Sequence, residues 1–90
     1  MPDSRAERLA WVRGLVSAGA VRSIRTSAGL SLREMAASVA DHLAEPEAGL
    51  SPTTVLRWEE GARPTGDRAL AYAVVLEQLT TTRTRRRAAS

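Results

Sequence analysis

The chain has 90 residues, with 13 basic residues against 10 acidic residues and a net charge of +3. This length fits one small domain with a modest core. The absence of Cys excludes disulfides and thiolate metal sites, and no apolar run approaches the ~20 residues of a membrane span. Without a long apolar segment at its N-terminus, the chain is expected to be cytoplasmic.

Charge is distributed unevenly along the chain. Residues 1–30 carry five Arg against two acidic residues, and residues 63–90 carry six Arg against two. Residues 31–62 carry two Arg against six acidic residues, so the ends are basic and the middle is acidic. The exclusive use of Arg over Lys fits codon bias in a GC-rich genome and says little about function.

The first thirty residues predict helix. Ser4 and Glu7 have the spacing of a capping box, and apolar residues follow at helical intervals. Two glycines weaken this region, which forms either one bent helix or two short helices meeting near Ser17. The helical face continues from Val21, and Gly29 ends it.

A second start signal lies at Ser31. Ser31 as N-cap and Glu34 three residues later form a full capping box. The apolar pattern carries this helix through Leu43 or Ala44. Pro46 then stops it, because the residue before a proline avoids the helical region.

The clearest segment is a short helix predicted over 52–60. Ser51 is a good N-cap, Pro52 suits the first helical position, and Gly61 suits the end. One side of this helix is suited to a core, and the other offers groups that suit base-pair edges in a major groove. The inner side holds Val55, Trp58 and Glu59, and the outer side holds Thr53, Leu56, Arg57 and Glu60.

A last helix is predicted over 66–79, and its apolar residues fall on two sides. Such a helix needs two partners, either within one small core or across a subunit interface. Residues 80–90 have almost no apolar content and are predicted to be a basic disordered tail, which leaves 1–79 as the folded domain. The tail arginines either track phosphates or only solubilise the chain; they are Arg83, Arg85, Arg86 and Arg87.

Two capped helices in succession suggest a helix-turn-helix motif over about 31–61. The residues in segments 24–25, 28–31, 35–36, 50–55 and 58–64 resemble those of the Cro/repressor-type family, the phage-repressor-like helix-turn-helix proteins of bacteria and their viruses. The resemblance covers about residues 20–79. It implies an all-α, λ-repressor-like fold of four or five helices, with the helix 52–60 as the recognition helix.

The resemblance also implies a function, a sequence-specific regulator of transcription that binds double-stranded DNA in a bacterial or phage-infected cell. The base contacts it implies come from Pro52, Thr53 and Arg57, and the helical count adds Leu56. The phosphate contacts are expected from Ser51, Thr54 and Arg63. The family often has a phosphate contact at the position of Leu32, which a leucine cannot make, and Arg33 is expected to take its place. Arg85, Arg86 and Arg87 in the tail are the remaining candidates for phosphate contact. A homodimer through the 66–79 helix would read two half-sites.

Arg25 and Glu59 match a family ion pair that ties the helix beginning near Val21 to the recognition helix. This pair is either buried or a loose surface contact. The chain departs from the family in an enlarged turn, because residues 40–48 are extra. Asp41, Glu45 and Glu47 would be repelled by phosphate, so this loop points away from DNA or contacts a protein partner over 41–48.

Other functions remain open at this stage. A phage excision or recombination accessory protein, or an antitoxin that regulates its own gene, would show the same motif. A protein-interaction module would use the acidic loop and the last helix. We expect no enzyme, metal or cofactor, because His42 is the single His and no Gly-rich phosphate loop ending in Lys exists.

Overall fold

Five helices account for the regular structure in the computed structural model, which describes the backbone of residues 4–43 and 50–89 and the side chains of residues 4–43 and 50–81. They are α1 (Arg5–Ser17), α2 (Val21–Ser27), α3 (Leu32–Ala40), α4 (Pro52–Glu59) and α5 (Gly66–Ala89). The described residues contain no strand. The prediction of an all-α chain with four or five helices is therefore confirmed for this part of the chain.

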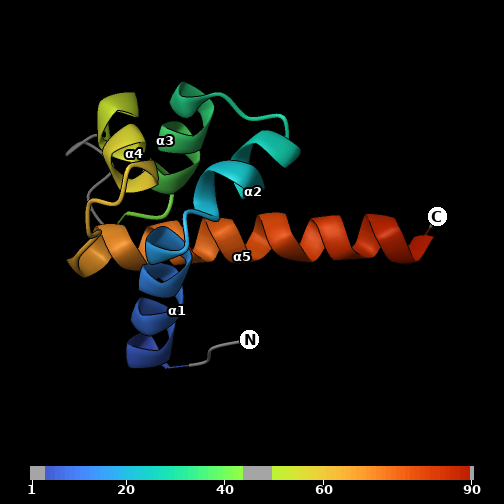
Figure 1. Cartoon of the computed structure of the whole chain (residues 1–90), viewed down its shortest axis with the longest axis horizontal. Helices are drawn as coiled ribbons and strands as arrows, with labels where there is room; N and C mark the ends of the chain where they lie inside the picture. Colours follow the sequence, from blue (N-terminus) through green and yellow to red (C-terminus); the bar gives the residue numbers. More distant parts are fainter. Residues whose placement is uncertain (1–3, 44–49, 90) are drawn as a thin grey trace.

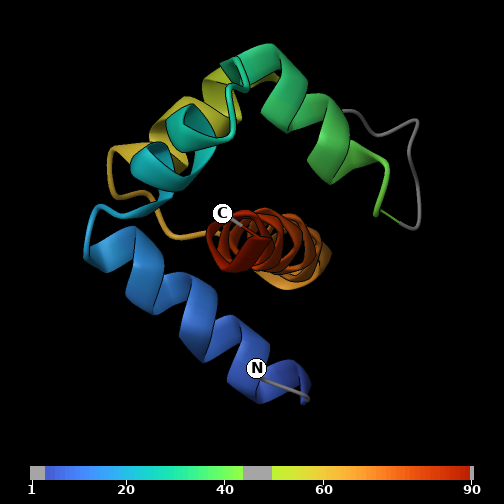
Figure 2. The ribbon, with the colours of Figure 1, turned by 90° about the vertical axis from the view of Figure 1, so that its right-hand side faces the viewer.

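The long helix α5 runs through the middle of the molecule (Figure 1). The helix α1 packs on one side of it, and α2, α3 and α4 gather on the other (Figure 2). Most of the buried apolar side chains are Ala or Val, and Trp58 and Tyr72 are the two aromatic ones. The full set comprises Val12, Val16, Val21, Met35, Ala36, Val39, Val55, Trp58, Ala69, Ala71, Tyr72, Ala73, Val75 and Leu76. Alanines on α5 allow its neighbours to approach closely.

Both apolar sides of α5 have partners inside the chain. The helix contacts α1 as well as α2 and α3. Tyr72 and Leu76 are fully buried, and Leu70 and Val74 are half-buried beside the end of α3, where they share a shallow groove with His42. The two-sided apolar pattern is thus accounted for by one core and does not by itself require a second subunit.

Local signals explain where the first two helices begin and end. The Ser4 hydroxyl accepts a hydrogen bond from the Glu7 N–H at 3.1 Å and caps α1. Gly19 has a φ of 70°, in the left-handed region that glycine adopts without strain, and it separates α1 from α2. Of the two predicted alternatives, the structure contains two short helices. Gly29, with a φ of 77°, follows α2 as predicted.

The capping box of α3 is complete. The Ser31 hydroxyl accepts from the Glu34 N–H at 3.1 Å, and the Ser31 N–H donates to the Glu34 carboxylate at 3.0 Å. This backbone hydrogen bond holds the pKa of Glu34 below its ordinary value. The helix ends at Ala40, so its predicted extension to Leu43 is wrong, and Ala44 lies outside the described residues. The N–H groups of the following turn bond three residues back, which tightens the chain out of the helix.

The structure also differs from the sequence prediction at the end of α5. The apolar pattern ends at Leu79, whereas the helix continues to Ala89 and extends beyond the other helices (Figure 1). Residues 80–89 contain neither Gly nor Pro and are rich in Arg, a good helix former. Nothing local therefore stops the helix where its apolar contacts end, and the predicted disorder of residues 80–89 is not what the structure describes.

The buried hydroxyl of Tyr72 generates a prediction about high pH. This hydroxyl has no hydrogen-bond partner among the described residues, and burial, reinforced by the negative charge of Glu59, raises the pKa of Tyr72 well above its ordinary value of 10. The unfolded chain binds fewer protons than the folded chain above pH 10, so stability is retained below pH 10 and falls as the pH rises further. Because Tyr72 is the single Tyr, tyrosinate absorbance reports it alone.

We expect tyrosinate to appear only as helical circular dichroism is lost. Tyr72→Phe keeps the ring and removes an unpaired hydroxyl, so it should match or exceed the parent in stability at neutral pH and lose less at high pH. Ionisation near pH 10 with full helical signal would contradict the buried position of this hydroxyl.

Candidate nucleic-acid interface

The predicted signals at both ends of α4 are present in the structure. The Ser51 hydroxyl accepts from the Thr54 N–H at 3.2 Å, and Pro52 occupies the first helical position. Gly61 has a φ of 108° just beyond the helix, where a residue with a side chain would be strained. The helix ends at Glu59, one position short of the predicted 52–60, because Glu60 is its C-cap.

The inner side of α4 is fixed by apolar packing. Val55 and Trp58 are buried, and the Trp58 ring packs on the Tyr72 ring of α5 with centroids 4.6 Å apart. Aromatic pairs at this spacing stabilise a core beyond their buried area. The outer side faces solvent as the helical count predicts: Thr53, Leu56, Arg57 and Glu60 are exposed.

An ion pair provides the second anchor of α4. The Arg25 guanidinium on α2 donates two hydrogen bonds to the Glu59 carboxylate, Nε to Oε2 at 2.5 Å and Nη2 to Oε1 at 3.1 Å. Its Nη1 donates to the Leu30 carbonyl at 2.8 Å, so the same side chain also holds the turn before α3. The side chains are 11% and 3% exposed, which makes this the buried version of the predicted pair.

The carboxylate of Glu59 acts on Arg25 mainly through these hydrogen bonds. They outweigh the opposing effect of burial and raise the pKa of Arg25 above its ordinary value, so the guanidinium stays charged at any ordinary pH. A pair this deeply buried tolerates the loss of neither member, because the survivor becomes an unpaired buried charge.

Hydroxyl groups at the start of α4 form a small donor unit. The Ser51 and Thr54 hydroxyl oxygens lie 3.0 Å apart, and either can donate to the other. One of the two hydroxyl protons forms this hydrogen bond, so the other is available to donate to a different group. Together with the positive end of the helix dipole, this arrangement is suited to an anionic oxygen such as that of a phosphate.

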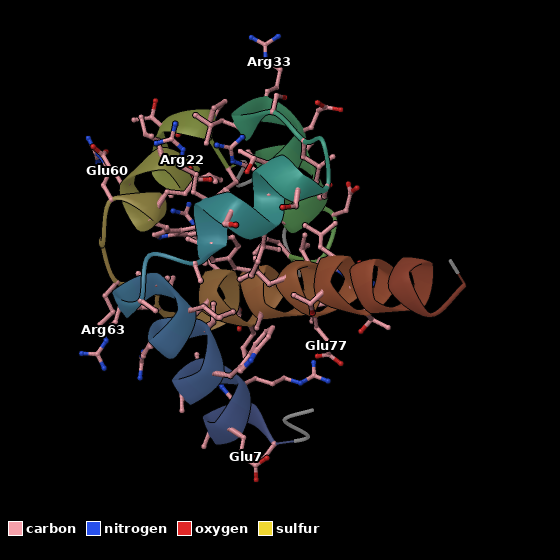
Figure 3. The ribbon with its side chains drawn as sticks, turned by 45° about the vertical axis from the view of Figure 1, so that its right-hand side comes forward. Glu7, Arg22, Arg33, Glu60, Arg63 and Glu77 are labelled. Atoms are coloured by element: carbon pink, nitrogen blue, oxygen red, sulfur yellow. The ribbon has the colours of Figure 1, made fainter. Side chains whose placement is uncertain are left out.

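The N-terminal ends of α3 and α4 lie at the same end of the molecule, on the side away from α1 (Figures 1 and 2). Arg33 in the first turn of α3 projects outward from this end (Figure 3). Its side chain is exposed and has no ion-pair partner in the described part of the chain. Two helix dipoles, the hydroxyl pair and Arg33 therefore share one surface.

Arg63 occupies a different place. It lies in the link that follows α4, beside the C-terminal end of α1, whereas Arg33 is far from it at the top of the view (Figure 3). Its side chain is exposed and unpaired among the described residues. The predicted contacts thus run along α4, with Arg33 and the hydroxyl pair at one end, Arg57 between, and Arg63 at the other.

Some predicted residues lie beyond what the structure describes. The loop expected to contact a protein partner, 41–48, is described only over Asp41, His42 and Leu43. Glu45 and Glu47 lie outside the described residues, so their proposed roles stay predictions. Arg85, Arg86 and Arg87 lie in the helical backbone of α5, but their side chains are outside the described set.

Sequence reasoning missed one polar group. Arg13 on α1 is half-buried, and its Nε atom is shielded from solvent and has no hydrogen-bond partner among the described residues. It lies in an N-terminal helix outside the motif, and its neighbours in sequence show only a helical apolar pattern. No local signal distinguishes it from a solvated Arg.

The chain matches no protein-family description, no curated protein and no solved structure. None of the helices, over the residues described, is long and apolar enough to cross a membrane. The case for a function therefore depends on the geometry of α2, α3 and α4.

The buried ion pair is tested by two arginines on the same helix. Arg25→Ala should lower the free energy of unfolding by about 3–5 kcal/mol, because Glu59 is left as an unpaired buried charge. Arg22→Ala is the matched control, since Arg22 is exposed on α2 and its loss should change stability by no more than about 0.5 kcal/mol. Urea and thermal unfolding measure both, and equal stabilities for the two variants would reject the buried pair as an anchor.

Proposed function

We propose that this protein is a sequence-specific regulator of transcription of the phage-repressor-like helix-turn-helix class, with α4 as its recognition helix in the major groove of double-stranded DNA. The observation that carries the proposal is the outer face of α4. That face presents hydroxyl, methyl and guanidinium groups to solvent while the inner face is held by Trp58 and Glu59.

The chemistry of this face suits base readout. Arg57 is exposed, and its planar fork matches the acceptors of guanine. Leu56 is 40% exposed, which leaves its methyl groups accessible for contact with a thymine methyl. Pro52 and Thr53 lie in the first turn, the part of a recognition helix that approaches the bases.

Phosphate contacts would flank the bases on both sides. The free hydroxyl proton of the pair Ser51 and Thr54, together with Arg33, suits a phosphate at the N-terminal end of α4. Arg63 suits a phosphate beyond its C-terminal end. A rigid α4 between two such anchors would fix the register of the protein on the duplex.

The regulatory mechanism we propose is passive. Two subunits would occupy two half-sites about one helical turn of DNA apart, and the bound dimer would block or recruit polymerase.

Selection from a pool of random duplexes at two salt concentrations tests the proposal. We expect a palindromic motif to be enriched and the logarithm of the affinity to fall with the logarithm of salt, by about 0.9 per phosphate contacted. Weak binding without an enriched motif would indicate an accessory role in recombination, and no binding at low salt would reject the DNA function and favour a protein-interaction module.

Three variants separate base readout from phosphate contact. Arg57→Ala should relax one position of the selected motif and cost about 1–3 kcal/mol of discrimination there. Arg33→Ala should weaken binding to all sequences alike and reduce the salt slope by about 1. Arg68→Ala removes the same charge from an exposed position on α5 and serves as the control. A motif unchanged by Arg57→Ala would contradict the assignment of α4 as the reading helix.

A further inference from the structure

A cavity of about 320 Å³ lies where the C-terminal end of α1 meets the link between α4 and α5. Its lining residues are Arg13, Val16, Ser17, Gly61, Arg63 and Pro64. The lining contains two arginines and no acidic residue. It therefore combines a defined hollow with an excess of positive charge.

Arg13 is the unusual member of this lining. Its Nε–H is buried and donates to no atom of the described residues, and its guanidinium has no ion-pair partner there. A buried donor without an acceptor destabilises a fold, and the effect is larger when the group is charged. Arg13 is one of the residues that line the cavity, so an acceptor bound there would lie next to the side chain that carries this unpaired donor.

The second arginine defines the charge of the acceptor. Arg63 lines the same cavity from the link after α4, and its side chain is exposed and unpaired among the described residues. Two arginines in the lining of one hollow give it an excess of positive charge, which a bound anion would neutralise. Phosphate accepts several hydrogen bonds at once from planar guanidinium forks, which makes it the best match in shape and charge.

We propose that the cavity between α1 and the α4–α5 link is a binding site for a phosphate group, held by Arg13 and Arg63. The phosphate comes either from a DNA strand passing the end of α4, in which case the proposal rests on the DNA-binding function, or from a free phosphate-bearing molecule. Either source would join α1 to the link and so couple the N-terminal helix to α4.

Inorganic phosphate is the first probe. We expect phosphate, exchanged for chloride at constant ionic strength, to raise the melting temperature and to shift the Arg13 Nε–H signal in a nitrogen–proton correlation spectrum. Arg13→Gln and Arg63→Gln should each bind phosphate about tenfold more weakly. Arg68→Gln, which removes a charge outside the lining, should respond as the parent does. Because Arg63 is exposed, its variant keeps the test decisive even if Arg13→Gln folds poorly.

The salt dependence of binding to duplex DNA identifies the source. A reduction of the salt slope by about 0.9 in Arg13→Gln, absent in Arg68→Gln, supports a DNA phosphate in the cavity. A phosphate-induced shift with an unchanged slope, or with no DNA binding at all, supports a free phosphate-bearing ligand. The proposal is overturned if phosphate has no effect on the protein and the salt slope of Arg13→Gln equals that of the parent. It is overturned equally if phosphate has no effect and the protein does not bind DNA. If the parent binds DNA and the Arg13→Gln slope is unchanged, only the cavity proposal fails, and the DNA-binding function is unaffected.

Discussion

The buried pair between Arg25 and Glu59 sets the orientation of α4, and the candidate interface depends on that orientation. One guanidinium joins α2, the turn before α3, and the end of α4 through three hydrogen bonds. Burying two charges is costly, and apolar residues of similar size would often stabilise a core equally well. What the pair adds is direction, because a planar fork meets a carboxylate in few geometries.

The rest of the core supplies a rigid base for this pair. Trp58 packs on Tyr72 of α5, and α5 in turn is held between α1 and the layer of α2 and α3. A short helix such as α4 is marginal in isolation, so its position depends on these tertiary contacts. Because the inner side is fixed by one aromatic and one ionic contact, the outer side presents Thr53, Leu56 and Arg57 in a defined arrangement. Preorganisation of this kind reduces the entropy lost when a surface binds.

Much of this fold was predictable because its signals are local. Ser4, Ser31 and Ser51 cap helices by bonding backbone N–H groups three residues ahead, and such contacts depend on adjacent sequence alone. The spacing of apolar residues on α4 separated its buried side from its exposed side correctly. The Arg25–Glu59 pair joins positions far apart in sequence, and it was expected only because the motif resembles a known family.

The features that escaped prediction depend on the arrangement of distant segments. The apolar pattern marks where α5 loses its contacts, at about Leu79, but a helix continues while no residue breaks it. The helix α3 ends at Ala40, before Pro46, because the N–H groups of His42 and Leu43 bond to carbonyls three residues back instead of four. The cavity at Arg13 arises because α1 meets the α4–α5 link, and the position of α1 against the motif has no counterpart in the family resemblance.

The most direct test of the central claim is a titration of isotope-labelled protein with duplex DNA, followed by the backbone amide signals. If α4 is the reading helix, the largest changes fall at residues 51–57 and at Arg33, on the surface where the N-terminal ends of α3 and α4 meet. Amide changes confined to the first half of α1 or to residues 41–43, or no changes at low salt, would contradict the claim.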